Sequence, residues 1–241
     1  MQRLRIRYAK RGRLRFTSHR DFSRAFERAL VRARIPMAYS SGFNPHPRIS
    51  YAGASPTGAA SEAEYLEIGL AEVVDPEQLA RDLDEALPDG LDVVQVVEAR
   101  PGSLADRLEA SRWQITVPLP LDRVTGAVEA FLARDAVGVE RMTKKGLRSF
   151  DSRAAVLALE VTPAAPPDAD PPDPAYVAGS RLDVVLRHTV PAVRPDDVLS
   201  GLRQVGGLED VSEDGRAPLV TRLAQGPLDE ASGAIGDPLS G

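Results

Sequence analysis

The chain has 241 residues, of which 43% are hydrophobic and 27% are charged, so it is long enough to bury one large or two modest cores. It has no cysteine, which excludes disulfides, a thiolate zinc site, a cysteine nucleophile and a cysteine-ligated iron–sulfur cluster. The net charge of −5 conceals an uneven distribution, because residues 1–50 hold 13 arginines or lysines against only Asp21 and Glu27, which makes +11 there and −16 in the remainder. Such sorting indicates a localised anionic partner.

The first elements in chain order are a strand pair and a helix. Apolar and basic residues alternate over 3–8 and again over 13–16, which predicts two strands around a glycine turn. Ser18 and Asp21 then have the spacing of a helix N-cap, and Pro36 ends the helix. One face of this helix is apolar, and the opposite face carries arginines at fourfold spacing, which should meet water or a partner. The apolar positions are Phe22, Ala25, Phe26, Ala29, Leu30 and Ala33, and the arginines are Arg20, Arg24, Arg28 and Arg32.

A long loop over 40–63 follows, and loops of this length inside a domain are usually functional or disordered. The prolines of Asn44-Pro-His-Pro-Arg48 restrict the backbone, so that His46 and Arg48 are expected to be held out with little entropy left to lose on binding. An aromatic ring beside arginine, as at Phe43, is what stacking on an unpaired base requires. The alternative is a proline-stiffened loop that packs on its own domain. The glycine-rich run 53–58 could cradle a phosphate, but it lacks the lysine of a P-loop.

The remaining patterns predict two domains. Strand, helix, strand, strand, helix and strand follow one another through residue 100, which is a βαββαβ order. We therefore expect an α+β protein made of two tandem ferredoxin-like units with antiparallel sheets. The predicted boundaries are 1–100 for the first domain, 101–112 for a linker, 113–225 for the second domain with a disordered insert at 163–179, and 226–241 for a flexible tail. Glu62 and Glu64, at the start of the third strand, are expected to pair with Arg48 or with the arginines of the helix.

Two further groups of residues carry chemistry. His19 and His46 could form a general acid and base pair, which would make the protein a metal-independent RNA-processing nuclease, but each also fits an ordinary surface position. A metal site from the same residues lacks a convincing third ligand. Lys144 and Lys145 form a second basic cluster, which fits either a hairpin turn or a nucleic-acid contact.

Several segments together resemble a known family. The run Arg13–Asp21, the helix segment Arg24–Leu30, the stretch Pro36–Pro47 and the segment Ser61–Tyr65 are similar to the radical-SAM-associated domain of unknown function. In that family the domain is often fused behind a cobalamin-binding radical SAM module, and this chain resembles the free form along nearly its whole length. The resemblance implies that any radical chemistry belongs to another polypeptide, since this chain cannot ligate the cluster. The family's association with RNA-processing and ribosomal genes points to RNA.

These observations support three functions. The first is a non-catalytic RNA-binding or accessory subunit that presents RNA of the tRNA or rRNA class to a separate radical SAM or RNA-processing enzyme, or docks on that enzyme. The second is the nuclease that uses His19 and His46, and the third is a pure protein-interaction subunit. We expect no cofactor in this chain, no membrane association and a cytoplasmic location, because no run approaches the roughly 18 apolar residues of a membrane span. The predicted nucleic-acid-binding residues are Arg20, Arg24, Arg28, Arg32, Phe43, Asn44, His46, Arg48, Lys144 and Lys145.

Overall fold

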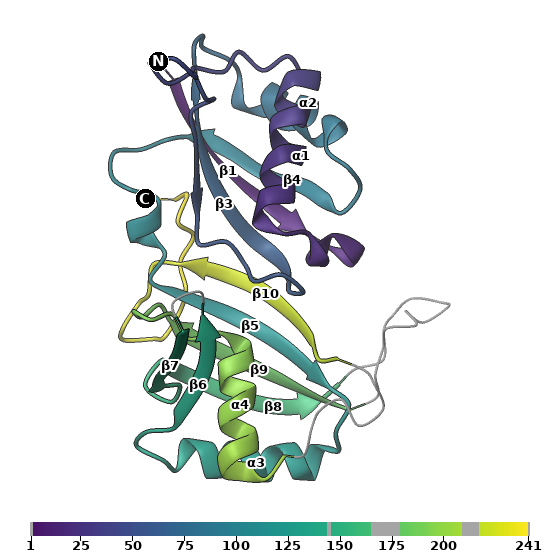
Figure 1. Cartoon of the computed structure of the whole chain (residues 1–241), viewed down its shortest axis with the longest axis vertical. Coiled ribbons are helices and arrows are strands. Elements are labelled where there is room, and N and C mark those ends of the chain that lie inside the picture. Colours follow the sequence, from purple (N-terminus) through teal and green to yellow (C-terminus); the bar gives the residue numbers. More distant parts are fainter. Residues whose placement is uncertain (1, 144–145, 165–178, 209–216, 241) are drawn as a thin grey trace. The chain divides into compact units, whose positions relative to one another are not determined.

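A computed structural model describes residues 2–143, 146–164, 179–208 and 217–240 of the chain. The chain divides into two compact units. Unit 1 contains the chain up to Leu108 together with Arg222–Pro227 and the segment from Gly236, and unit 2 contains the described residues between Glu109 and Thr221 together with Leu228–Ile235. The described residues form four α-helices and mostly antiparallel strands (Figure 1), which confirms the expected α+β class.

Unit 1 is an antiparallel sheet with two helices on one face (Figure 1). Its strand order is β4-β1-β3-β10, and β2 pairs with residues Tyr65–Ile68 of β3. The elements are β1 (Gln2–Lys10), a 3₁₀ turn η1 (Gly12–Phe16), α1 (His19–Arg32), β2 (Ile49–Ala52), β3 (Ala60–Leu70), α2 (Pro76–Ala86), β4 (Leu91–Glu98), a 3₁₀ turn η2 (Ala105–Arg107) and the residues from Arg222 of β10 (Leu219–Gly226).

The core of unit 1 lies between the sheet and its helices. Leu4 and Ile6 of β1 pair with Ile68 and Leu66 of β3, and all four side chains are fully buried. The apolar faces of α1 and α2 cover them, because each helix repeats its large apolar residues at the helical period. The buried helix residues are Phe22, Phe26, Ala29, Leu30, Leu79, Leu83 and Ala86.

Unit 2 has an antiparallel sheet in the order β5-β9-β8 and a separate hairpin of β6 and β7. Two helices, α3 and α4, pack against each other. The elements are β5 (Ala110–Val117), α3 (Leu121–Leu132), β6 (Gly138–Thr143), β7 (Gly146–Asp151), β8 (Val156–Pro163), β9 (Ser180–Arg187), α4 (Pro195–Gly206) and the first residues of β10.

The predicted strand at 13–16 is wrong, because these residues form the 3₁₀ turn η1. Gly12 has a φ of +52°, and the amides of Leu14 and Thr17 close tight turns on Arg11 and Leu14. The partners of β1 are instead β3 and β4, one on each side, so no edge of β1 is left for a hairpin partner.

The segment 226–241, for which the sequence predicts a flexible tail, makes defined contacts among the residues that the structure describes. Leu228 forms a β-bridge with Ile235, and Leu239 is buried beside Leu104 and Leu108. The Arg107 guanidinium donates to the Ser240 carbonyl. The buried leucine and these backbone contacts fix a segment for which composition alone predicts no regular structure. The predicted disordered insert at 163–179 falls mostly on 165–178, which lie outside the described residues.

Candidate nucleic-acid interface

Helix α1 presents the candidate site of unit 1. Ser18 is its N-cap, as the Ser-x-x-Asp spacing predicts: the Ser18 Oγ accepts a hydrogen bond from the Asp21 amide at 3.2 Å and donates to the Asp21 carboxylate at 2.6 Å. The apolar face is buried, which fixes the rotation of the helix about its axis and turns the opposite face outward.

The outward face carries the arginine ridge, which we define as Arg20, Arg24, Arg28 and Arg32. All four side chains are exposed. The first three have no hydrogen bond or ion pair with any residue that the structure describes, whereas Arg32 donates to the Ala86 carbonyl at 3.1 Å. Successive members are separated by about 6 Å along the helix axis, because four residues each rise about 1.5 Å. The ridge is therefore a row of three cations without a described partner, followed by a fourth that is hydrogen-bonded to a backbone carbonyl.

A shallow depression of about 400 Å³ lies on this face, lined by Arg24, Glu27, Arg28 and Val31. Val31 is 74% exposed, so an apolar patch accompanies the charges. Glu27 is the one acidic side chain in that lining, and it forms no ion pair with the described arginines. The depression is therefore lined by two guanidinium groups, one carboxylate and one exposed aliphatic side chain.

Part of the positive charge of the first fifty residues is neutralised by carboxylates of unit 1. Arg5 is only 1% exposed. Besides its ion pair with Glu67, it donates to the carbonyls of Arg100 and Gly102 at 3.0 and 2.6 Å. Arginines that are paired with carboxylates are less available to a ligand than the unpaired guanidinium groups of α1. The intramolecular ion pairs are Arg3–Glu67, Arg5–Glu67, Arg11–Glu62 and Arg11–Asp92.

The loop before β2 forms a compact projection, which we call the tongue and define as Ser40–His46. Its two ends are joined by hydrogen bonds from the Ser40 amide to the His46 carbonyl at 2.9 Å and from the His46 amide to the Ser40 Oγ at 3.0 Å. Phe43 at the tip is fully exposed, and Asn44 and the His46 ring are exposed as well. The tongue is thus an ordered loop that displays an aromatic ring.

Arg48 lies at the base of the tongue. Its Nε donates to the Tyr39 carbonyl at 3.3 Å, and its amide donates to the Ala38 carbonyl at 2.8 Å. The stem of the side chain crosses Gly69 of β3, where a Cβ would meet the Arg48 Cβ at 3.2 Å. Glycine at that position leaves room for the arginine, whose guanidinium remains exposed without a carboxylate partner among the described residues.

The two candidate histidines make separate contacts. The His19 ring meets the edge of Tyr51 at 4.8 Å between centroids, and its Nδ1 lies 3.4 Å from the Ser23 Oγ. His46 belongs to the tongue, and no described ring contact or hydrogen bond joins it to His19. Burial raises the pKa of Tyr51, so this phenol stays neutral near pH 7. Within the described ranges no three His, Asp or Glu side chains gather in a way that could hold a metal ion.

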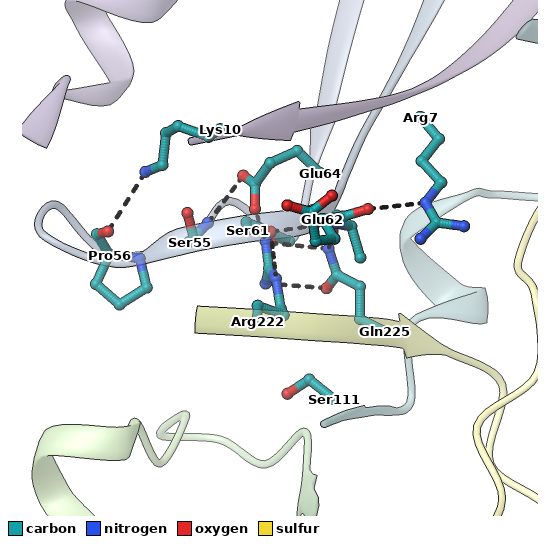
Figure 2. Close-up of polar contacts among 12 residues, drawn as sticks. Arg7, Lys10, Ser55, Pro56, Ser61, Glu62, Glu64, Ser111, Arg222 and Gln225 are labelled. Atoms are coloured by element: carbon teal, nitrogen blue, oxygen red, sulfur yellow. Dashed lines mark hydrogen bonds and ion pairs between the residues drawn. The ribbon is translucent and has the colours of Figure 1, made fainter. Parts of the chain in front are cut away.

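Glu64 and Glu62 have partners that differ from the expected ones. Neither pairs with Arg48 or with the arginine ridge. Glu62 binds Arg11. Glu64 binds Arg222 of β10 (Figure 2). The expectation was wrong because β3 places both carboxylates beside β1 and β10 rather than beside the outer face of α1.

The Glu64–Arg222 pair is the centre of a buried polar cluster, and both side chains are 3% exposed. The second Glu64 oxygen accepts from the Ser55 amide at 3.0 Å, and Arg222 also donates to Ser61 and Gln225. The amide of Ser55 therefore binds the protein's own carboxylate, which leaves it unavailable to cradle a phosphate in the run 53–58. Sequence reasoning missed Arg222, because nothing local in the sequence marks a residue as the partner of a carboxylate 158 positions away.

Lys10 lies at the rim of this cluster and is also buried. It is 5% exposed, and its ammonium has one long hydrogen bond, 3.5 Å to the Pro56 carbonyl (Figure 2). Burial lowers the pKa of Lys10, and the nearby Glu64 carboxylate opposes that shift. This lysine is therefore part of the interior of unit 1 rather than of its ligand-facing surface.

Lys144 and Lys145 lie outside the described residues. The strands on either side of them, β6 and β7, belong to unit 2, whereas the arginine ridge and the tongue belong to unit 1. Unit 1 alone thus contains the other eight predicted nucleic-acid-binding residues.

Comparison with known proteins identifies the family. A family described as "Uncharacterized protein conserved in bacteria (DUF2344)" has a sequence model that matches residues 3–195. The chain belongs to this family. The match shows a domain of unknown function, and the association with radical SAM enzymes stays a prediction. A search of curated proteins found no match.

Among solved structures, one titled "An RAMP protein binding different RNA substrates" is similar to this DUF2344 chain. The two share 11% identity over 77% of this chain and 88% of the other, with a TM-score of 0.20. A TM-score this low does not show that the two chains share a fold. The described helices are all too short or too polar to cross a membrane.

Proposed function

We propose that this member of the family is a non-catalytic RNA-binding accessory subunit, and that the arginine ridge of α1 contacts RNA phosphates. The observation that carries the proposal is the set of three exposed guanidinium groups, Arg20, Arg24 and Arg28, that have no partner among the described residues. Other cations of unit 1, such as Arg5 and Arg11, are paired with carboxylates. An uncompensated row of arginines attracts a polyanion.

The sequence around the ridge supports a polyanion over a protein ligand of mixed charge. Between Glu27 and Glu62 the chain contains no aspartate or glutamate, but it contains Arg28, Arg32 and Arg48 together with one further arginine. The exposed arginines of this stretch can form bidentate contacts with phosphates.

Finer features of the proposal rest on inference. The strand order of unit 1, β4-β1-β3 with β2 beside β3, supports a ferredoxin-like plan. We further propose that the RNA is of the tRNA or rRNA class and that the subunit presents it to, or docks on, a separate radical SAM or RNA-processing enzyme. Catalysis by His19 and His46 is left out of the proposal, because no described contact joins the two rings.

The test is charge reversal on the ridge with a matched control. Arg24→Glu with Arg28→Glu changes the charge by −4, and Arg123→Glu with Arg134→Glu makes the same change at exposed arginines of unit 2. Binding of a fluorescent single-stranded RNA is measured by anisotropy across a salt series, with circular dichroism as the check on folding. The ridge variant should bind the RNA more weakly, and its slope of log K against log salt should be smaller by about 1.4, because each single-strand phosphate contact contributes about 0.7.

The result that would overturn the proposal is a folded ridge variant that binds RNA like the wild type at low salt. Loss of binding in both variants would show that net charge alone is responsible and would also count against a site on α1. Recovery of the protein from cells with and without nuclease distinguishes the alternative, since a bound protein that survives nuclease treatment favours a pure protein-interaction subunit.

A further inference from the structure

We infer that the tongue selects unpaired nucleotides by stacking a nucleobase on the Phe43 ring. This inference rests on the proposed RNA binding and names the substrate class: RNA with single-stranded segments. The arginine ridge accounts for attraction to phosphates, which duplex and single strand share, whereas an exposed aromatic ring can distinguish the two.

The environment of Phe43 differs from that of every other phenylalanine in the chain. Phe22, Phe26 and Phe131 are at most 4% exposed. Phe16, which is 60% exposed, and Phe150 each have a guanidinium over the ring, at 4.6 and 4.8 Å from the ring centroids. Phe43 is fully exposed and has no ring contact with the described residues. Because the other rings each have a partner within the protein, the bare ring at the tip of the tongue is available for a ligand.

The backbone beneath Phe43 is already ordered. Besides the two hydrogen bonds between Ser40 and His46, Tyr39 forms a β-bridge with Pro47. Gly42, with a φ of +135°, turns the chain directly before the ring. The prolines on either side of His46 fix further backbone angles. A ligand that binds this tongue therefore pays little conformational entropy, which distinguishes it from a mobile loop that happens to contain a phenylalanine.

The segments on either side of the tongue are hydrogen-bonded to β3. The Ala38 amide donates to the Gly69 carbonyl at 2.8 Å, and the Gly69 amide donates to the Arg48 carbonyl at 2.9 Å. The exposed Arg48 guanidinium is thus held at the base of the same loop, with Tyr39 53% exposed beside it. A cation next to aromatic rings is the combination that holds the phosphate and the base of one unpaired nucleotide.

Duplex RNA cannot use this ring, because its bases are stacked on one another and present only their edges in the grooves. An apolar pocket on a protein partner could also accept a phenylalanine, but the exposed Arg48 at the base of the tongue, in a stretch of sequence without Asp or Glu, favours an anionic ligand. The observations therefore favour an unpaired nucleotide.

The experiment compares two RNA probes and four proteins, all full-length. The probes are a labelled twelve-nucleotide oligouridylate and a labelled twelve-base-pair RNA duplex. The proteins are the wild type, Phe43→Ala, Phe43→Trp and the control Val73→Ala, which truncates another exposed apolar side chain of unit 1. Phe43→Ala should weaken oligouridylate binding by about 5- to 150-fold, the range that base stacking on an aromatic ring contributes. Its affinity for the duplex, and its salt slope, should match those of the wild type.

The tryptophan variant gives an independent readout. Phe43→Trp should retain affinity for oligouridylate, and the introduced indole should be quenched when the RNA binds. The only natural tryptophan, Trp113, is 5% exposed and lies in unit 2, so it should contribute a constant background.

The outcomes separate this inference from the proposed function. If the wild type binds neither probe, the proposed function fails. If the wild type binds and the arginine ridge is required, but Phe43→Ala binds both probes like the wild type or loses affinity equally for both, then the inference about unpaired nucleotides alone is overturned. The absence of indole quenching on bound oligouridylate would overturn it as well.

Discussion

Removal of Arg222 should unfold unit 1 locally and leave unit 2 largely intact. The substitution Arg222→Met keeps the aliphatic stem of the side chain and deletes the guanidinium that binds Glu64, Ser61 and Gln225. The buried Glu64 then keeps the Ser55 amide as a hydrogen-bond donor but loses the guanidinium that pairs with it.

The size of the effect follows from burial. Breaking a buried ion pair by removing one partner costs about 3–5 kcal/mol, because the remaining charge stays uncompensated in the interior. The Lys10 ammonium interacts with Glu64 and should keep the loss nearer the lower end of that range. Even so, the loss is a large share of the 5–15 kcal/mol that typically separates a folded domain from its unfolded state.

Hydrogen exchange followed by mass spectrometry is the suitable assay, since it reads each unit separately. Peptides of β1 and β3 in Arg222→Met should exchange about 10²- to 10³-fold faster than in the wild type, while peptides of β5 and β9 should change little. The matched control is Arg187→Met, which removes an arginine from the exposed Arg187–Glu230 pair of unit 2. This substitution should change the stability of unit 2 little, because solvent and salt screen an exposed ion pair.

Two results would refute the reasoning. One is an Arg222→Met protein whose β1 and β3 peptides exchange like those of the wild type. The other is a double variant, Arg222→Met with Glu64→Leu, that is less stable than Arg222→Met alone, because removing the orphaned carboxylate should restore part of the loss.

Three further outcomes are expected. Arg34 is the only non-glycine residue with positive φ in the described ranges, at +54°. Because glycine adopts this conformation without strain, Arg34→Gly should raise the free energy of unfolding by about 1 kcal/mol. An unchanged melting temperature would contradict this. Ser18→Ala should cost about 1 kcal/mol by deleting the cap of α1, whereas Ser41→Ala on the exposed tongue should cost almost nothing, both by urea denaturation. Burial raises the pKa of Tyr65 to about 12, so the folded state retains its proton after the unfolded chain loses it near pH 10, and wild-type stability should fall between those values. Tyr65→Phe should lose about 2 kcal/mol less than the wild type from pH 8 to pH 12, and parallel losses would rule out this titration.

Helix α1 shows what local patterns can predict. Its cap, its buried face and its arginine ridge all follow from spacings of three and four residues, which depend only on helix geometry. The direction in which the arginines point was therefore predictable from the sequence, as was the α+β class.

The partners of charged residues were not predictable in this way. Alternation along β1 suggests that Arg5 faces solvent, yet its side chain is buried under the carbonyls of Arg100 and Gly102. Likewise Glu64 meets Arg222 because β10 returns to unit 1. Such pairings depend on which distant segment covers a strand, and periodicity within the strand carries no information about that.

The return of Arg222–Pro227 to unit 1 has a consequence for the order of events during synthesis. The amino-terminal hundred residues emerge from the ribosome first, but the guanidinium that neutralises their buried carboxylate arrives only after most of the chain has been made. Until then Glu64 has no arginine beside it, so the buried polar cluster of unit 1 can be completed only once translation has passed residue 222.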